Sequence, residues 1–415
     1  MSESLTLPSL RQVPPTPFYV YSESNLNAMV RKIRGALPAG VDVHFALKSN
    51  HNPRVLQLYR EQGFGIDIVS GGELRYALAQ SFRPEQIVFS GVGKSLPELE
   101  LAIESGVGLI NIESEFELHD VVAVARRLGK RARVGFRLNP DVDAKTHPYI
   151  ATGLRAHKFG ISFEDSRQIL AGLADLADAV ELCGLSMHIG SQIRDLSAIR
   201  EAAFKLLGEA KPWCARYPSL KVLDLGGGLG ISYENPTEMA DFASYAAILS
   251  EVRTEWCAVA GTEARLALEL GRSLVAGAGF LFTRVLGIKS NRGTNFCVVD
   301  ASMTELMRPA LYQAHHEILP HGASKQGNAK VFDIVGPVCE SSDVLGRERR
   351  LPEALAVGDV LVICSAGAYG YVLSSVYNMR RLPAEYWLDE RGNLHQVRRA
   401  MEWDELNGML TVITP

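Results

Sequence analysis

The sequence lacks any long apolar run, and none of its 415 residues belongs to a stretch long and apolar enough to span a bilayer. It also lacks an excess of one charge, because 43 Lys and Arg stand against 47 Asp and Glu, for a net charge of −4. This balance argues against a nucleic-acid groove and against a membrane-binding face. The segment Met1–Ser4 is not followed by a basic stretch and an apolar run, so we expect no signal peptide.

Cysteines are few and scattered, and they form neither a CxxC pair nor a zinc-binding spacing. This pattern is typical of reduced thiols, so we expect a cytoplasmic protein without a metal site. The composition, 47% hydrophobic and 22% charged, is that of an ordinary globular protein long enough for two domains. The six cysteines are Cys183, Cys214, Cys257, Cys297, Cys339 and Cys364.

Apolar, strand-like runs alternate with helical patterns over roughly the first two thirds of the chain. The strand-like runs lie at 41–48, 63–69, 86–91, 107–112, 131–138, 180–189, 221–227 and 265–271. The helical patterns lie at 24–37, 52–62, 72–80, 96–105, 114–128, 162–176, 196–217 and 239–259. Strands and helices that alternate in this way over about 250 residues have the size and rhythm of a (β/α)8 barrel. A doubly wound open sheet is the alternative, although it usually has fewer parallel strands of this regularity.

The rhythm changes after the eighth run, where short strand-like segments are separated by Gly, Pro and charged turns. These segments lie at 279–290, 295–301, 331–335, 360–365 and 410–413, which favours a mostly antiparallel β domain. We therefore predict an α/β protein with a barrel at 24–278 and a β domain at 279–415, joined by the N-terminal segment 1–23. A strand at 18–21 lies outside the barrel alternation, and we expect it to pair with the β domain.

One lysine stands at the carboxyl end of the first barrel strand. Lys48 follows the apolar run Val41–Leu47, where burial of an ammonium group is costly unless the group is paired, neutralised or covalently used. In a barrel of this kind, the carboxyl ends of the strands face the active site. Lys48 is therefore a candidate Schiff-base lysine for a carbonyl cofactor, with a lysine whose amine lies in solvent as the alternative.

Polar residues and glycines follow several of the other predicted strands. Backbone N–H groups of Gly226–Gly230 would cradle a phosphate, although a flexible turn is the alternative. Gly271–Ser273 would add donors after the eighth strand, where barrels usually bind phosphate. His188 is either a core histidine or a ring that stacks on a flat cofactor. Glu269 is either half of an ion pair or the partner of a protonated pyridine nitrogen.

Three polar clusters occur in the second part of the chain. Gly336–Asp343 follows a predicted strand and places Cys339 beside Glu340, so Cys339 is a candidate acid rather than an inert small hydrophobe. Ser365–Gly370 also follows a predicted strand. Arg308–Tyr312 offers a guanidinium group for a carboxylate, with a surface turn as the alternative.

Taken together, these stretches resemble the fold-type III PLP-dependent amino acid decarboxylases. The resemblance runs from about Pro17 to Tyr386, and it rests on the order of several stretches that are each weak alone. The stretches are Phe45–Asn50, Asn139–Gly160 (with His147–Tyr149), His188–Ile193, Gly226–Tyr233, Glu269–Arg272, Arg308–Tyr312, Gly336–Asp343 and Ala366–Gly370. Within the family, the chain is most similar to members that act on meso-2,6-diaminopimelate, which implies decarboxylation of that amino acid to L-lysine and CO₂.

The resemblance implies how pyridoxal 5′-phosphate (PLP) would be held. Lys48 would bind its aldehyde covalently, His188 would stack on its ring, and Glu269 would hold its pyridine nitrogen. Tyr369 would contact both the cofactor and the substrate. The other cofactor-binding positions that the resemblance implies are Asp67, Ser191, Gly227, Gly228, Leu270, Gly271 and Arg272.

The resemblance also implies where the substrate would lie. Arg272 and Arg308 would bind the carboxylate that does not react, Glu340 would bind the ammonium group beside it, and Tyr312 and Tyr369 would be further contacts. Cys339 would return a proton to the carbanion after CO₂ leaves, which makes it catalytic together with Lys48 and His188. In this family the site is shared across a head-to-tail homodimer, so Cys339 and Glu340 would serve the partner's Lys48.

The chain departs from the family pattern at Leu270, at Ser342 and at Val372–Leu373, and several alternative functions stay open. Family members usually have Pro where Leu270 stands and Gly where Ser342 stands. Because Leu270 restores a backbone N–H and frees φ, we expect the phosphate loop to differ slightly. Ornithine, arginine, a D-amino acid or a carboxylated polyamine is an alternative substrate, and an alanine-racemase-like reaction or a non-enzymatic PLP carrier is a further alternative. Arg308 with Glu340 favours a substrate that bears both charges at its distal end.

Overall fold

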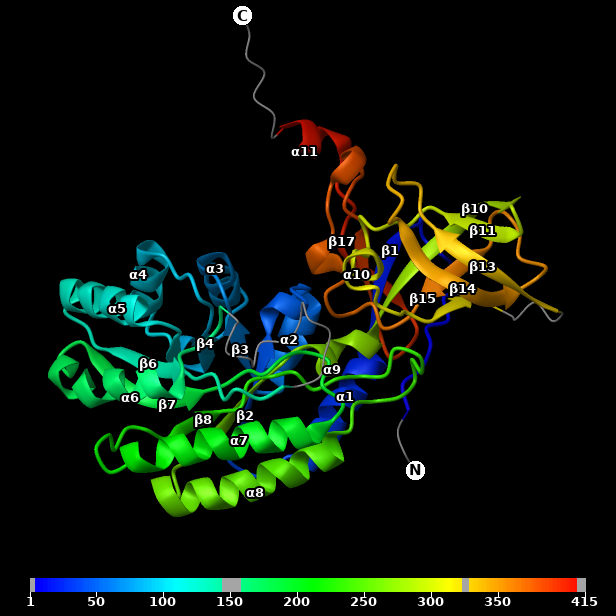
Figure 1. Cartoon of the computed structure of the whole chain (residues 1–415). Coiled ribbons are helices and arrows are strands. Elements are labelled where there is room, and N and C mark those ends of the chain that lie inside the picture. Colours follow the sequence, from blue (N-terminus) through cyan, green and yellow to red (C-terminus); the bar gives the residue numbers. More distant parts are fainter. Residues whose placement is uncertain (1–3, 144–157, 323–327, 409–415) are drawn as a thin grey trace, which may run out of the picture.

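The computed structural model of the chain describes residues 4–143, 158–322 and 328–408. Two expectations, the stretch His147–Tyr149 and the strand at 410–413, lie outside the described residues. Figure 1 shows a barrel surrounded by helices and, beside it, a β-rich part formed by about the last third of the chain together with the N-terminal strand.

The first part is a closed barrel of eight parallel strands in chain order, as predicted. Its first strand, β2 (Val41–Ala46), closes the barrel against its last strand, β9 (Arg265–Leu270). Short apolar strands of this kind are expected where helices cover the outside of a parallel sheet. The strands between them are β3 (Gly65–Ile68), β4 (Ile87–Phe89), β5 (Leu109–Ile112), β6 (Ala132–Arg137), β7 (Val180–Ser186) and β8 (Val222–Asp224).

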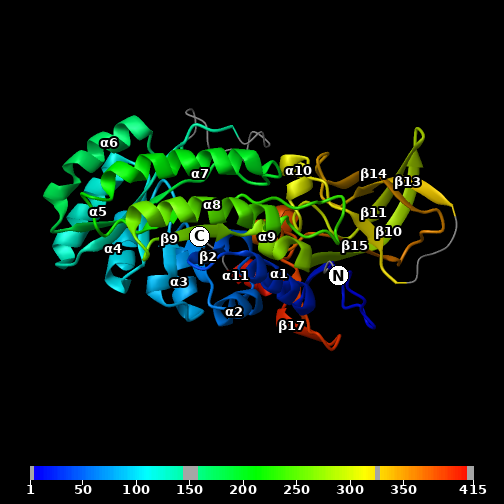
Figure 2. The same cartoon turned by 90° about the horizontal axis from the view of Figure 1, so that it is seen from below.

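Helices cover the outside of the barrel, and Figure 2 shows several of them from below. Helix α5 (Glu115–Leu128) begins at Ser114, whose hydroxyl accepts the N–H of Glu117, and it ends at the left-handed Gly129. The other helices of this part are α1 (Glu23–Ala36), α2 (Pro53–Glu61), α3 (Gly71–Ala79), α4 (Leu96–Ser105), α6 (Phe163–Gly172), α7 (Leu196–Ala210), α8 (Phe242–Ala260) and α9 (Arg272–Val275).

The second part is a mostly antiparallel sheet built around the N-terminal strand. Strand β1 (Phe18–Ser22) pairs antiparallel with β10 (Gly279–Asn291) and parallel with β16 (Ala384–Leu388), which confirms the expected pairing of 18–21. The remaining strands are β11 (Thr294–Val299), β12 (Ile318–Pro320), β13 (Ala329–Val335), β14 (Val344–Pro352), β15 (Val360–Ile363) and β17 (Leu394–Arg398). Neighbouring strands follow one another across the sheet in the order β14-β13-β11-β10-β1-β16-β17. Strand β15 lies off this path and pairs with β10 and β12. Two short helices, α10 (Arg308–Tyr312) and α11 (Trp403–Gly408), also belong to this part.

Several boundaries differ from the sequence-based expectations. Strands β12, β14, β16 and β17 were not expected. Strand β12 has only three residues, β14 is rich in arginine and is interrupted by register shifts against β13, and β17 is a polar edge strand. Helix α7 ends at Ala210 rather than at 217, and Pro212 follows in a 3₁₀ turn. Each of these differences lies away from the carboxyl ends of the barrel strands.

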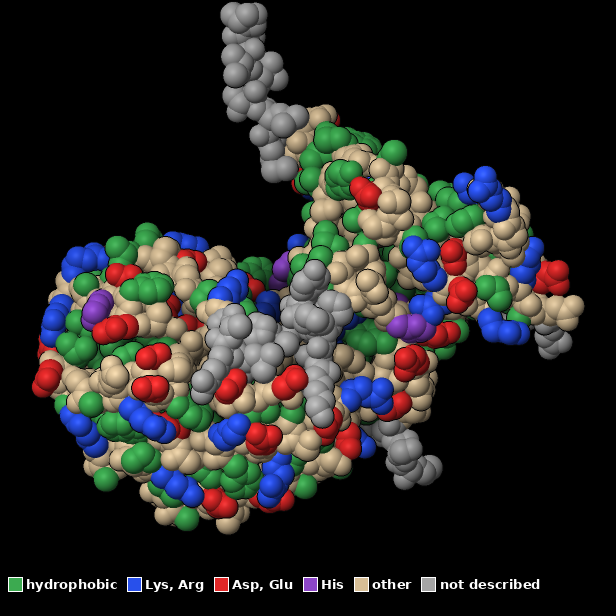
Figure 3. Space-filling model, in the orientation of Figure 1, with side chains coloured by type: hydrophobic (Ala, Val, Ile, Leu, Met, Phe, Trp, Pro, Cys, Tyr) green, Lys and Arg blue, Asp and Glu red, His purple; other side chains and the backbone are tan. Residues whose placement is uncertain are grey.

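Within residues 4–143, 158–322 and 328–408, no helix combines the length and the apolar character that crossing a bilayer needs. On the face drawn in Figure 3, Lys and Arg side chains are interspersed with Asp and Glu side chains. This mixture agrees with the near balance of charges in the sequence.

Candidate active site

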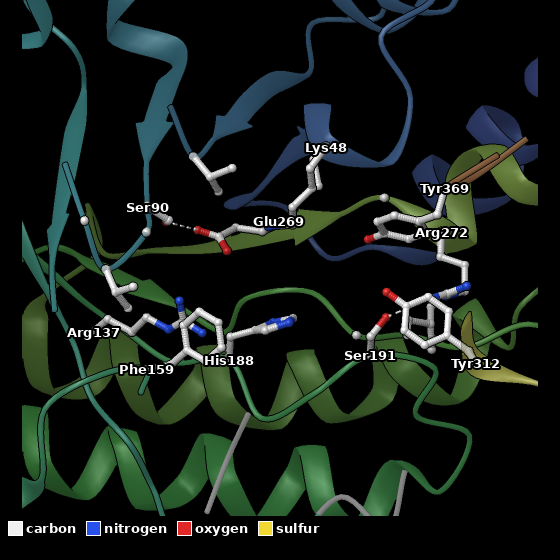
Figure 4. Close-up of a pocket in the computed structure, with 18 of the residues that line it drawn as sticks. Lys48, Ser90, Arg137, Phe159, His188, Ser191, Glu269, Arg272, Tyr312 and Tyr369 are labelled. Carbon is white, nitrogen blue, oxygen red and sulfur yellow. Dashed lines mark hydrogen bonds between the residues drawn. The ribbon is translucent and has the colours of Figure 1, made fainter. Parts of the chain in front are cut away.

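A cavity of about 470 Å³ lies at the carboxyl ends of the barrel strands. The loop after β15 and helix α10 complete its wall, so both parts of the chain contribute to it. In Figure 4, Lys48 and His188 border the cavity from opposite sides, while Glu269 and Arg272 lie toward opposite ends. The predicted site residues that line the cavity are Lys48, His188, Ser191, Gly228, Glu269, Gly271, Arg272, Arg308, Tyr312 and Tyr369.

Lys48 lies in a 3₁₀ turn, Leu47–Ser49, directly after β2. Its Nζ lies 3.0 Å from Oδ2 of Asp67, which stands in β3 and is fully buried. Burial alone would lower the pKa of Lys48, but the carboxylates of Asp67 and Glu269 outweigh burial and raise this pKa above its usual value. The ion pair therefore holds the amine of Lys48, whose side chain is 37% exposed, at the wall of the cavity.

The loop that carries Lys48 is bonded to the loop that carries Tyr369. The carbonyl oxygen of Ser49 accepts the N–H of Tyr369 at 2.8 Å, and Nδ2 of Asn50 donates to the carbonyl oxygen of Gly367 at 2.8 Å. Tyr369 has a φ of +56°, a conformation that costs a residue with a side chain about 1–3 kcal/mol. These bonds fix the tyrosine beside the lysine, although the two lie in different parts of the fold.

Glu269 stands near the end of β9 and is oriented by a chain of hydrogen bonds. Ser90 Oγ donates to Oε1 of Glu269 at 3.1 Å, and Nδ2 of Asn111 donates to Ser90 Oγ at 3.1 Å. Burial first, and then the carboxylates of Asp224 and Asp67, raise the pKa of Glu269 well above its usual value. A buried carboxyl group among other carboxylates is stabilised by a partner that brings a positive N–H, such as a protonated pyridine nitrogen.

His188 follows β7 and presents a neutral ring to the cavity. The N–H of Gly227 donates to its Nδ1 at 3.1 Å, so Nδ1 carries a lone pair. Burial, followed by the charges of Arg137 and Lys48, lowers the pKa of His188 well below its usual value. An uncharged ring that borders the cavity opposite Lys48 suits stacking against a flat cofactor.

The glycine turn after β8 and the start of α9 form an anion-binding corner. Gly228 has a φ of +102°, and a Cβ there would lie 2.4 Å from the carbonyl oxygen of Gly190, so the position requires glycine. In the described part of the chain, the backbone N–H groups of Gly228 and Gly271 have no intramolecular acceptor. Ser191 Oγ lies 3.1 Å from Nη2 of Arg272. Backbone N–H groups, a hydroxyl and a guanidinium group together match the oxygens of a phosphate.

Two buried arginines lie at the same end of the cavity. Arg272 is 7% exposed and Arg308 is 5% exposed, and both guanidinium groups contact the ring of Tyr233, with Cζ atoms 5.8 Å and 4.5 Å from its centroid. Neither arginine forms an ion pair with a carboxylate within the residues that the structure describes. Burial first, and also the charge of Arg272, lower the pKa of Arg308. This positive charge without a counterion is suited to an anionic group of a ligand.

Five of the predicted residues do not line the cavity. Asp67 and Gly227 act on it through their bonds to Lys48 and His188. Leu270 is fully buried between two residues that do line it. The last two, Cys339 and Glu340, are exposed on the loop between β13 and β14. A single chain therefore does not bring them to its own Lys48.

The sequence-based predictions did not name several residues of the site, among them Ser90, Arg137, Phe159 and Tyr233. Ser90 and Arg137 line the cavity from the ends of predicted strands, so the strand-end rule applied throughout would have found them. Phe159 also lines it and has the guanidinium group of Arg137 4.9 Å from its ring centroid. Tyr233 contacts both buried arginines. Both aromatic residues lie in stretches that carry the family resemblance, Asn139–Gly160 and Gly226–Tyr233, but neither their residue type nor their spacing predicts these contacts.

These features fit a flat pyridine that bears an aldehyde and a phosphate, because an amine, a carboxyl group and an anion-binding corner surround one cavity. Residues 23–276 match the family model described as pyridoxal-dependent decarboxylase, pyridoxal binding domain. The chain belongs to the pyridoxal-dependent decarboxylases, and it is an enzyme whose cofactor is pyridoxal 5′-phosphate.

Its relatives narrow this class. Over 402 residues, the chain is 39% identical to diaminopimelate decarboxylase of Aquifex aeolicus, with 97% of this chain and 93% of the relative covered. It is 42% identical over 412 residues to diaminopimelate decarboxylase of Pseudomonas aeruginosa, with 98% and 95% covered. The crystal structure of diaminopimelate decarboxylase from Helicobacter pylori complexed with L-lysine superposes with a TM-score of 0.88 at 37% identity, with 95% and 96% covered.

Proposed function

We propose that this chain decarboxylates meso-2,6-diaminopimelate to L-lysine and CO₂ and thereby serves lysine synthesis. The observation that carries the proposal is the pair of buried guanidinium groups, Arg272 and Arg308, in the cavity that Lys48 also lines. A carboxylate remote from the reacting carbon would satisfy them. Diaminopimelate has such a second carboxylate, whereas lysine, ornithine and arginine do not.

At the reacting end, bound PLP supplies a π system that accepts the electron pair of the breaking bond between Cα and the carboxylate. Lys48 holds the cofactor and exchanges protons through Nζ, where Asp67 orients it. The carboxylate of Glu269 would hold the protonated pyridine nitrogen, and Ser90 donates to that carboxylate and fixes its direction. His188 keeps water from one face of the ring. These residues contribute orientation and charge placement, which enzymes of this kind add to the chemistry of the cofactor.

At the distal end, Arg272, Arg308 and Tyr312 bind the carboxylate that is retained. All three line the cavity, and Tyr233 lies against both guanidinium groups. Arg272 also reaches Ser191, so its guanidinium group stands between the phosphate corner and the substrate carboxylate. This arrangement ties the position of the cofactor to the position of the substrate.

We propose that the active enzyme is a homodimer, in which Cys339 and Glu340 of each chain complete the site of the other. Their exposure, together with their absence from the cavity of their own chain, supports this arrangement. Light scattering combined with activity measurements tests it, and an active monomer contradicts it. Variants Lys48→Ala and Cys339→Ala, each inactive or slow alone, should regain activity on mixing, because one of the two mixed sites carries both native residues.

The remaining proposals concern location and domain division. We propose a cytoplasmic enzyme, which the six cysteines without disulfides support. We also propose that 24–278 and 279–415 are its two domains, with 1–23 joining them through β1.

The substrate is tested by CO₂ release from meso-diaminopimelate beside L-lysine, L-ornithine and L-arginine. We expect release from meso-diaminopimelate and little from the others, because only this substrate places a carboxylate against Arg308. Release from ornithine or arginine at an equal rate would assign the chain to another basic amino acid. Interconversion of D- and L-alanine without CO₂ would indicate a racemase instead.

A further inference from the structure

One buried titratable residue touches the distal end of the site from behind. His316 lies between α10 and β12 and is fully buried. Its Nε2 lies 2.8 Å from Nη1 of Arg308, and its Nδ1 lies 2.9 Å from the carbonyl oxygen of Cys364. The ring therefore connects the arginine of α10 to the end of β15.

The two contacts of His316 define its protonation. A carbonyl oxygen only accepts a hydrogen bond, so Nδ1 of His316 carries the hydrogen. A guanidinium group only donates, so Nε2 carries a lone pair that accepts from Arg308. A second proton would place one N–H against another. Burial, followed by the charge of Arg308, lowers the pKa of His316 well below its usual value, in agreement with a neutral ring.

The other groups around Arg308 are uncharged or positive. The ring of Tyr233 lies under its guanidinium group and meets His316 edge-on, with centroids 5.0 Å apart and planes at 72°. Arg272 donates from Nη1 to the hydroxyl of Tyr233. Across the described ranges, Arg308 and Arg272 have no carboxylate partner. Two like charges are thus held close together by neutral groups alone.

A neutral acceptor differs from a carboxylate in its effect on the site. A Glu or Asp behind Arg308 would also fix its guanidinium group, but the negative charge would cancel much of the attraction for an incoming anion. The imidazole fixes one N–H of Arg308 and leaves its net charge for the ligand. His316 therefore orients the guanidinium group of Arg308 without neutralising its positive charge.

We infer that His316 is a positioning residue for Arg308, and that its lack of charge sets the affinity of the site for the distal carboxylate of the substrate. This inference rests on the proposed function, because it assigns the carboxylate of diaminopimelate to Arg308. His316 does not line the cavity and touches no reacting atom, so it acts through the arginine.

The experiment compares three variants of the full-length enzyme loaded with PLP. His316→Gln keeps a neutral acceptor, His316→Leu removes the acceptor, and His316→Glu replaces it with a charged one. The matched control is His315→Gln, because His315 directly precedes His316 in the chain but contacts Arg349 and Glu317 instead. The readouts are kcat and KM for meso-diaminopimelate, the inhibition constants of L-lysine and of 1,5-diaminopentane, and the absorbance of bound cofactor.

We expect His316→Gln and the His315 control to stay within about threefold of the wild type. His316→Leu should raise KM and the L-lysine constant about tenfold, the effect of one weakened bond to a charged group, and His316→Glu should raise them further. The diamine lacks a carboxylate, so its inhibition constant should not change. The value of kcat and the cofactor absorbance should also stay near those of the wild type.

Three results overturn the inference. The first is equal behaviour of the Gln and Glu variants, which would show that the charge at this position is irrelevant. The second is a parallel loss for L-lysine and the diamine, which would show a structural role. The third is a Gln variant that fails to load PLP. If the Leu variant does not fold, the comparison of the Gln and Glu variants still tests whether the charge at position 316 matters. If the wild type releases no CO₂ from diaminopimelate, the proposed function fails, while the ratio between L-lysine and the diamine still tests His316.

Discussion

The loop that carries Cys339 offers a sharp test, because a buried aspartate organises it from within the same chain. Asp343 is 3% exposed. Its Oδ1 accepts the N–H of Met303 at 2.6 Å, and its Oδ2 accepts the N–H of Val338 at 2.8 Å. Cys339 itself donates its N–H to Oδ1 of Asn378 at 3.0 Å. Asp343→Ala would therefore release the loop without touching the cavity of its own chain.

The magnitude follows from the two bonds to the carboxylate of Asp343. Each hydrogen bond to a charged group contributes about 1.5–3 kcal/mol, so their loss costs the loop about 3–6 kcal/mol of local stability. Since 1.36 kcal/mol corresponds to a factor of ten, the equilibrium ratio of the native loop to its displaced forms falls at least about 100-fold. If Cys339 must reach the partner's site, kcat/KM should fall by up to a similar factor, because a loop with little stability to spare loses most of its native population. The cofactor should remain bound, because Asp343 lies outside the residues that line its cavity.

The assay measures CO₂ release and the absorbance of bound cofactor in parallel. The matched control is Asp333→Ala. Asp333 lies in β13, the strand before this loop, and its carboxylate accepts one backbone N–H, that of Glu348 at 2.8 Å, rather than one from the loop itself. We expect the control to keep most of the activity. Unchanged turnover in Asp343→Ala, or an equal loss in both variants, would refute the argument that this loop serves catalysis.

Three further predictions concern the cavity itself. Lys48→Ala should abolish CO₂ release and the covalent attachment of cofactor on borohydride reduction, which mass spectrometry of the reduced protein measures; an adduct at another lysine would contradict the assignment. Gly228→Ala should weaken cofactor binding at least tenfold, since a strained φ alone costs about 1–3 kcal/mol and its Cβ would approach the carbonyl oxygen of Gly190. Gly208→Ala is its control, because a Cβ there meets nothing within 4 Å. Burial raises the pKa of Asp224 from 3.8 to about 6, so the folded chain holds this proton more tightly than the unfolded chain does. The stability of the cofactor-free protein should therefore fall as pH rises from about 4 to about 6, and Asp224→Asn should flatten that slope in thermal melts; an unchanged slope would exclude Asp224 as its source.

Much of the barrel and of its rim was determined by the sequence alone. Alternating apolar runs and helical patterns predict parallel strands, and the carboxyl ends of parallel strands meet at one rim. This rule alone predicts that Lys48, His188, Glu269 and Gly228 lie together, and all four line one cavity. It works because burial of strand and helix faces leaves a periodic signal within each segment.

What the tertiary structure alone decided is which distant residues face one another. The role of His316 depends on its contacts with Arg308 and with the carbonyl oxygen of Cys364, which lies 48 positions further along the chain. Tyr233 lies against two arginines that belong to different parts of the fold. Periodicity records whether a side chain is buried, but not which partner it meets. Such partners depend on how the barrel and the second sheet pack together, and that packing also leaves Cys339 and Glu340 exposed on the surface.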